Sequence, residues 1–226
     1  MNSILRWMWH LLPASVRHAV GGDLIDKSYV SISHQFDRWM DRRYGISTTD
    51  ATIVAPRSQF GDSNRNLSTD YLRLLILRRR LKLTHDDRLI DLGSGYGRVL
   101  FVFARDVGLA RGVELDPGSF ATFKENISHF KRSKNVVAVL ADCATFQFED
   151  ENLFYLFNPF GPETMRVVFE NIRASVRRNP RRIRVVCFYE AGDLIAAQTW
   201  LRLTNSMMVL RKKYLIFEND PVAQSA

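Results

Sequence analysis

The chain has 226 residues, of which 46% are hydrophobic, and its formal net charge is +8. This composition excludes wholesale disorder and supplies enough apolar side chains for a sizeable core. The two cysteines, Cys143 and Cys187, are too few for a disulfide framework and lack the paired spacing of a zinc site. The five histidines are scattered along the chain, so we expect no metal centre.

The chain begins with an apolar segment that is not a membrane span. Residues 1–12 fall short of the ~20 apolar residues that cross a bilayer, and Arg6 interrupts them. No small-residue cleavage site follows, so we expect no signal peptide and a cytoplasmic location. We expect the segment to pack onto the body of the protein. The alternative is a peripheral membrane contact, because Trp7 and Trp9 lie beside Arg6.

The first part of the chain lacks the alternation of strands and helices that marks the remainder. Helices are expected near residues 13–20 and 27–44, and the polar stretch 58–66, rich in glycine, asparagine and serine, indicates a loop. We therefore divide the chain into a helical N-terminal extension, residues 1–66, and a second domain, residues 67–226.

One helix is expected before the first strand. Its apolar positions are Leu74, Leu77 and Leu81, and Ser68 or Thr69 is placed to cap its N-terminus. It should end before the polar run that precedes the strand.

The first strand leads into a glycine-rich loop. Residues 89–92 form a strand-like run that carries Asp91, and glycines follow at alternate positions: Gly93, Gly95 and Gly97. A helical pattern begins directly afterwards, with apolar side chains at Val99, Val102, Phe103 and Val107. Because glycine permits positive φ and has no Cβ, this loop is built to let a ligand press against the backbone.

The spacing of these glycines distinguishes between cofactors. The dinucleotide fingerprint is G-x-G-x-x-G, with a helix N-terminus turned to a pyrophosphate. Here the third glycine comes one residue early, and Asp91 lies two residues before the first. A carboxylate there suits a positively charged cofactor better than one that bears phosphates. A nicotinamide-dependent oxidoreductase is therefore disfavoured.

The second strand, residues 111–115, follows about 20 residues after the loop and places Glu114 near its carboxyl end, where an acid suits a ribose diol. Asp116 and Pro117 then indicate the start of a helix. Its expected buried side chains are Phe120, Phe123, Ile127 and Phe130.

The later elements continue the alternation. Strands are expected at residues 136–140, 153–157 and 182–189, with a helix between the last two that buries Met165, Val168, Phe169 and Ile172. Asp193 is placed to cap a helix that reaches Leu203, and two final strands are expected at residues 207–210 and 214–217. Alternating βα units predict a parallel sheet with right-handed crossovers.

The pattern D-x-G-x-G-x-G, followed by an acid that closes the next strand, resembles motif I of the class I S-adenosylmethionine-dependent methyltransferases. The run Asn158-Pro159-Phe160-Gly161 resembles motif IV of a small member of that family. The resemblance covers roughly residues 67–218. It implies an α/β, Rossmann-like, doubly wound and mostly parallel seven-stranded sheet with a closing antiparallel strand. It also implies methyl transfer by in-line displacement from S-adenosyl-L-methionine to an unidentified acceptor.

The resemblance also implies the site residues. Those expected to bind the cofactor are Asp91, Gly93, Ser94, Gly95, Tyr96, Gly97, Glu114, Leu115, Asp142, Cys143 and Asn158. Asp142 would accept from the adenine amino group, and the backbone N–H of Cys143 would face the ring. The alternative for Asp142 is a turn or cap residue.

The acceptor side is expected to carry Asn158 and Phe160. Asn158 would offer its amide oxygen to the nucleophile, and Phe160 would wall the methyl-transfer site; the alternative is a plain turn with Phe160 in the core. Amino-group methyltransferases carry two prolines in this motif, whereas this chain has one. The resemblance therefore leans only slightly to a nitrogen acceptor on a macromolecule. Tyr189 and Glu190 are further candidates, or strand-end surface residues.

The kind of binding partner is indicated by three cationic clusters, which lie within residues 78–82, 177–184 and 211–213. They favour an anionic macromolecule, either nucleic acid or an acidic protein face. A solvated cationic rim is the alternative and is favoured, because arginines are common at helix C-termini. Two other functions stay open on the same fold: a catalytically silent cofactor-binding module and a basic nucleic-acid-binding protein.

Overall fold

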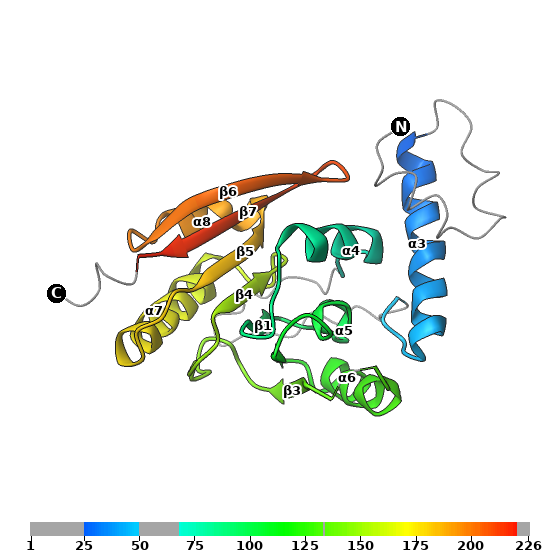
Figure 1. Ribbon diagram of the computed structural model, residues 1–226, viewed down its shortest axis with the longest axis horizontal. Coiled ribbons are helices and arrows are strands. Elements are labelled where there is room, and N and C mark those ends of the chain that lie inside the picture. The colour runs from blue at the N-terminus through cyan, green and yellow to red at the C-terminus, as the bar shows by residue number, and fades with distance from the viewer. Residues whose placement is uncertain (1–24, 50–67, 133, 221–226) are drawn as a thin grey trace.

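The computed structural model describes residues 25–49, 68–132 and 134–220 (Figure 1). The apolar segment 1–12, the helix expected near residues 13–20 and the loop expected at 58–66 lie outside these ranges. Among the described residues, every helix is too short or too polar to cross a bilayer.

Seven strands form one sheet in the order β3-β2-β1-β4-β5-β7-β6. Neighbours among β1 to β5 pair in parallel, whereas β7 runs antiparallel to both β5 and β6. The strands are β1 (Arg88–Leu92), β2 (Leu109–Glu114), β3 (Val136–Leu140), β4 (Leu153–Leu156), β5 (Arg184–Phe188), β6 (Leu201–Val209) and β7 (Lys212–Asn219). The predicted seven-stranded, mostly parallel sheet with an antiparallel closing strand is confirmed.

Helices cover both faces of the sheet. Their apolar side chains fall into two buried clusters, one shared by α3 to α6 and the other by α7 and α8. The helices are α3 (Ile25–Tyr44), α4 (Tyr71–Arg80), α5 (Arg98–Phe103), α6 (Pro117–His129), α7 (Pro162–Arg178) and α8 (Gly192–Ala196), with the 3-10 turn η1 (Tyr189–Ala191) before α8. This is the layered arrangement that alternating βα units require.

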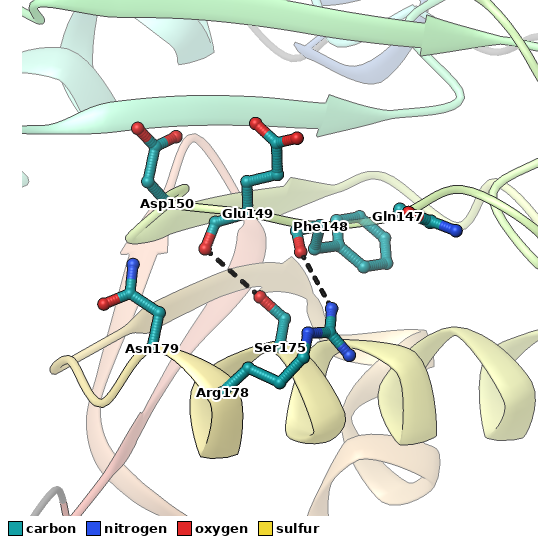
Figure 2. A pocket seen from close by; sticks show the side chains of 7 residues that line it. All are labelled: Gln147, Phe148, Glu149, Asp150, Ser175, Arg178 and Asn179. Carbon is teal, nitrogen blue, oxygen red and sulfur yellow. Dashed lines mark hydrogen bonds between the residues drawn. The ribbon is translucent and has the colours of Figure 1, made fainter.

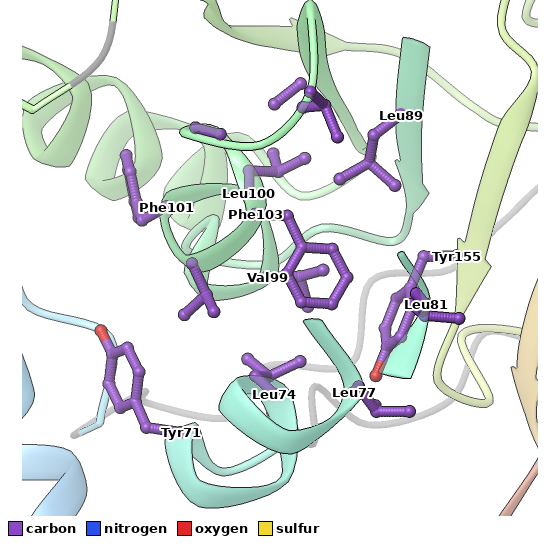
Figure 3. Packing of buried hydrophobic residues seen from close by; sticks show 14 of the residues in the cluster. Tyr71, Leu74, Leu77, Leu81, Leu89, Val99, Leu100, Phe101, Phe103 and Tyr155 are labelled. Atoms are coloured by element: carbon purple, nitrogen blue, oxygen red, sulfur yellow. The ribbon is translucent and has the colours of Figure 1, made fainter. Parts of the chain in front are cut away.

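The larger cluster joins α4 and α5 to the centre of the sheet (Figure 3). Leu74 and Leu77 of α4 are fully buried together with Phe103 of α5 and Leu89 of β1. Each buried side chain of this size contributes roughly 1.5–3 kcal/mol. Helix α3 also packs against α4, so the described end of the N-terminal extension joins the same core. The boundary drawn at residue 66 stays a prediction.

The helix caps agree with the sequence at one position and differ at another. Asp116 caps α6 as predicted, its carboxylate accepting from the Ser119 N–H at 2.7 Å, with Pro117 in the first turn. Helix α4 is capped by Asp70 instead of Ser68 or Thr69. The prediction of Thr69 as the cap was wrong. Its hydroxyl is instead hydrogen bonded to the Tyr155 hydroxyl of β4 at 2.8 Å.

The C-terminal elements correct the sequence prediction most strongly. Helix α8 has no side-chain cap and ends at Ala196, and a strand begins at Leu201 where a helix was expected to continue. Strand β6 is an edge strand, and its ladder with β7 begins where Leu201 pairs with Asn219. The strand expected at residues 207–210 overlaps the end of β6, but most side chains of β6 are exposed, so no apolar pattern marked its beginning.

Several predicted boundaries also move by a few residues. The fifth strand ends at Phe188, and Tyr189 starts the 3-10 turn. Helix α5 ends at Phe103, so Val107 is buried beyond it. In α6, Phe123 and Phe130 are buried as expected, whereas the other two positions of the predicted stripe are half-buried.

Candidate functional site

The glycine loop connects β1 to α5 at the carboxyl edge of the parallel strands. Gly93, Gly95 and Gly97 have φ values of 76°, 53° and 86°, in the left-handed region that favours glycine. A Cβ on Gly93 would lie 2.6 Å from the Cβ of Pro159, and one on Gly97 would lie 2.3 Å from the Phe123 ring. The loop therefore needs glycine for its backbone and for close packing. The first of these contacts also places the end of β4 against the loop.

Glu114 holds this loop from the end of β2. Its side chain is buried, and the carboxylate accepts from the N–H groups of Gly95 at 2.7 Å and Asp116 at 2.9 Å. Burial raises the pKa of the Glu114 carboxyl, and the two backbone hydrogen bonds partly offset that rise. Each carboxylate oxygen has a second lone pair, so this arrangement leaves acceptor capacity for a ribose.

Most of the backbone donors of the loop are occupied within the protein. The N–H groups of Gly93 and Ser94 both donate to the Val113 carbonyl at 3.0 Å, and that of Gly97 donates to the Ser94 carbonyl at 2.9 Å. Together with the Gly95 N–H that Glu114 accepts, four loop donors are engaged. A phosphate-binding loop works by presenting such N–H groups to the ligand. This loop is therefore poorly suited to a phosphate.

Asp91 is the least compensated acid at the site. Its residue is 3% exposed, and no hydrogen bond to its carboxylate is found among the described residues. Burial, followed by the charge of Glu114, raises the pKa of Asp91 well above its ordinary value, and nothing lowers it. The hydroxyl of Ser94 is also buried without a partner in the described chain. Unpartnered buried polar groups are costly, so this corner is arranged to receive a polar or cationic ligand.

Asp142 and Cys143 form a turn after β3. The Asp142 carboxylate accepts from the Ala144 N–H at 2.8 Å, and its carbonyl accepts from the Thr145 N–H at 3.0 Å. This is the turn geometry given above as the alternative role of Asp142. Gly93 is also among the groups that act on the pKa of the Cys143 thiol, which relates this turn to the glycine loop. Burial raises the pKa of the Cys143 thiol, which disfavours the thiolate form that a nucleophile needs.

The end of β4 has an unusual backbone. Asn158 has a φ of 56°, and its side-chain N–H donates to the Glu190 carboxylate at 3.1 Å. This hydrogen bond joins the turn after β4 to η1 after β5. Phe160 is only 6% exposed and packs in the cluster of α7 and α8, which corresponds to its alternative role in the core. Tyr96 and Leu115 are half-buried beside the loop.

An aromatic group missed by the sequence reasoning stands at the same edge. The rings of Phe157 and Phe188 lie 5.1 Å apart at the carboxyl ends of β4 and β5. Lys212 lies over Phe188, with its Nζ 4.7 Å from the ring centroid. The signal available in the sequence was an aromatic residue at the end of each strand.

A hollow at the opposite edge is a different kind of feature (Figure 2). It lies between the segment that precedes β4 and the end of α7. Ser175 donates to the Glu149 carbonyl at 3.3 Å, and Arg178 donates to the Phe148 carbonyl at 3.4 Å. These bonds fasten α7 to the chain, at the edge away from the glycine loop.

Much of the cationic excess is used in the same way. Arg80 donates to the Met208 carbonyl at 2.7 Å, Arg182 pairs with Glu218 at 2.7 Å, and Arg181 donates to the Glu151 carbonyl at 2.8 Å. These contacts join helices and strands that are distant in sequence. They weaken the case that the arginine clusters exist to bind an anionic partner.

Solved structures share this arrangement of strands and helices. An RNA methyltransferase from Salinibacter ruber, crystallised with S-adenosyl-L-homocysteine, matches with a TM-score of 0.52 at 18% identity, over 68% of this chain and 94% of that chain. The pyocyanin biosynthetic protein PhzM matches at 0.55 and 12% identity, over 66% and 55%. A ribosomal protein L11 methylase from Lactobacillus delbrueckii subsp. bulgaricus matches at 0.51 and 10% identity, over 68% and 81%. The fold is that of the class I S-adenosylmethionine-dependent methyltransferases.

Similarity in sequence covers a smaller part of this chain than similarity in fold. An uncharacterised protein of Methanocaldococcus jannaschii is 31% identical over 88 residues, or 38% of this chain. The chain spans 34% of the length of that curated relative. No protein-family model matches the sequence. The fold prediction is confirmed by structure, and the roles of individual residues stay predictions.

Proposed function

We propose that the protein is a methyltransferase that binds S-adenosyl-L-methionine at the glycine loop and transfers its methyl group by in-line displacement. The observation that carries this proposal is the buried, uncompensated Asp91 beside Glu114, at the carboxyl edge of a methyltransferase fold. Ligands of open α/β sheets bind at this edge.

The charge of the site favours this cofactor. S-adenosylmethionine carries an ammonium and a sulfonium, and either cation would offset the carboxylates of Asp91 and Glu114. A dinucleotide would bring phosphates toward the same two acids. It would also find most N–H groups of the glycine loop already engaged. Both arguments favour the sulfur nucleoside over a nicotinamide cofactor.

The residues of the loop and its neighbours would divide the work of binding. Asp91 would face positive charge, Glu114 would accept from the ribose, and Asp142 would accept from the adenine. When bound, the cofactor supplies a methyl group on a good leaving group. The chain's own task is then to hold the acceptor in line and to exclude water, which explains a site made mostly of binding residues.

The acceptor side supports a nitrogen nucleophile. Asn158 and Glu190 meet at the ends of neighbouring strands, 3.1 Å apart, and Glu190 is exposed. An amine must lose a proton before it attacks, and an exposed carboxylate is suited to receive it. Two of the structurally similar proteins are named for RNA or a ribosomal protein, which supports a macromolecular acceptor. A cytoplasmic location stays a prediction.

The test is a calorimetric titration of the full chain with S-adenosylmethionine, S-adenosylhomocysteine and NADH. We expect the two sulfur nucleosides to bind and NADH not to bind. The Asp91→Asn variant should lose the binding of S-adenosylmethionine. Asp86→Asn is a matched control, because Asp86 is exposed and precedes the same strand at the opposite edge. Binding of NADH, or of none of the three, would refute the proposed cofactor.

A labelled methyl donor then tests catalysis in a cell extract. Transfer of the label to RNA or protein would support the enzyme and identify the class of acceptor. Binding without any transfer would favour the catalytically silent module.

A further inference from the structure

Arg98, the first residue of α5, has a buried side chain directly after the glycine loop. Its five N–H donors match five hydrogen bonds: to the Asp37 carboxylate at 2.7 Å, to the hydroxyl and the carbonyl of Thr48 at 2.8 Å each, to the Thr49 hydroxyl at 3.0 Å and to the Thr69 carbonyl at 3.3 Å. Every acceptor belongs to the chain that precedes α4. A planar guanidinium can make this set of bonds, and an ammonium cannot.

Asp41, near the end of α3, binds the segment that carries the acceptors of Arg98. Its carboxylate accepts from the Thr48 N–H at 2.7 Å, and from the hydroxyls of Thr48, Thr49 and Tyr71 at 2.6 Å each. The Tyr71 ring in turn lies under the Arg98 guanidinium at 4.8 Å. Of the two acids of α3, Asp37 thus accepts from Arg98 directly, and Asp41 holds the acceptors Thr48 and Thr49 in place.

A second side chain joins the same segment to the loop. Asn126 of α6 is 2% exposed and donates to the carbonyls of Ser47 at 2.9 Å and Tyr96 at 3.1 Å. Its amide oxygen accepts from the Ser47 N–H at 2.8 Å. Tyr96 lies inside the glycine loop, so Asn126 connects the loop directly to Ser47.

We propose that Arg98 and Asn126 are positioning residues that fix the glycine loop against residues 37–49, which makes the N-terminal extension a working part of the cofactor site. The inference rests on the proposed function and deepens it. Neither side chain is required to touch the cofactor. They act by limiting the movement of residues 93–97, so that the loop is already in its binding conformation.

The test compares two arginines of similar chemistry in the full chain. Arg98→Lys keeps the charge near Asp37 but loses most of the hydrogen bonds. Arg184→Lys is the matched control, because Arg184 pairs with Asp87 at 2.7 Å and donates to the Leu81 carbonyl at 2.9 Å, at the opposite edge of the sheet. We expect Arg98→Lys to bind S-adenosylmethionine at least tenfold more weakly, and Arg184→Lys to bind it as the native chain does.

Hydrogen exchange provides a readout that does not need the cofactor. Amides in residues 93–97 should exchange faster in Arg98→Lys and at the native rate in Arg184→Lys. Unchanged exchange in both variants, or an equal increase in both, would overturn the inference. If the native chain fails to bind S-adenosylmethionine, the proposed function fails, and the exchange comparison still decides the role of Arg98.

Asn126→Asp covers the case in which Arg98→Lys does not fold. This variant loses both donors to Ser47 and Tyr96 and leaves the Arg98 network intact. We expect faster exchange confined to the loop and the Ser47 segment, with global stability that still permits folding. Loop exchange at the native rate in a folded Asn126→Asp chain would overturn the inference.

Discussion

Within the described chain, buried acids have cationic partners at one edge of the sheet and lack them at the other. At the amino edge, Glu151 is fully buried and pairs with Arg111, and Asp87 is buried and pairs with Arg184 at 2.7 Å. At the carboxyl edge, Asp91 is 3% exposed and meets only the like charge of Glu114. At the amino edge the chain thus pairs both buried acids with arginine. An acid left without a cation at the other edge marks a place kept for a ligand.

Substitution of one acid from each edge should therefore have opposite effects on the stability of the unliganded protein. Asp91→Asn should stabilise the unliganded protein by about 1 kcal/mol, because it removes an uncompensated buried charge. The same change should weaken S-adenosylmethionine binding roughly 100-fold, about 3 kcal/mol. Glu151→Gln should leave binding unchanged and lower the free energy of unfolding by about 2 kcal/mol, because it breaks a paired acid. Denaturant titration and calorimetry of both variants check this crossover; destabilisation by Asp91→Asn would break the comparison.

Variants of Glu114 test whether one carboxylate serves both the glycine loop and the cofactor. Glu114→Ala should cost about 1.5–3 kcal/mol of S-adenosylmethionine binding, because it removes both the expected ribose acceptor and the acceptor of the Gly95 N–H. Glu114→Gln keeps an oxygen acceptor and should lose less. Calorimetric titration of both variants measures the difference. Native affinity in the alanine variant would show Glu114 to be an acid of structural importance only.

The pH dependence of stability should also separate the two edges. The pKa of Asp91 is raised above its ordinary value of 3.8 in the native chain, so the native chain retains a proton after the unfolded chain has released it. The free energy of unfolding therefore falls as pH rises above that ordinary value. Asparagine does not titrate, so the stability advantage of Asp91→Asn should be small near the ordinary pKa and grow toward neutral pH. Denaturant titrations across that range check it; an advantage independent of pH would contradict the assignment to Asp91.

The smallest effect is expected at the acceptor side. Asn158 has a φ of 56°, so Asn158→Ala should cost about 1 kcal/mol of stability and Asn158→Gly should cost less. Both variants lose the amide that pairs with Glu190, so both should slow methyl transfer to an amine. Thermal unfolding and the transfer rate measure the two effects. Equal stability of the alanine and glycine variants would contradict the expected cost of a positive φ at residue 158.

Local patterns in the sequence were enough for the central strands, the glycine loop and the acid that closes β2. A strand period, a turn glycine and the Asp116 cap are each encoded within a few neighbouring residues. The same patterns failed for the first part of β6, because the exposed part of an edge strand has no buried face to mark it. They also failed for the cap of α4, where the rival Thr69 side chain had a partner in β4.

The partners of buried charges were decided only in three dimensions. Arg98 and Asp37 are separated by 61 residues, and no local period relates them. The sequence shows where an arginine or an acid stands, but its cost and its use depend on which groups surround it after folding. For that reason the sequence alone identified the loop and its acids, whereas the tertiary structure revealed that Asp91 is uncompensated and that Arg98 and Asn126 contact residues 37–49.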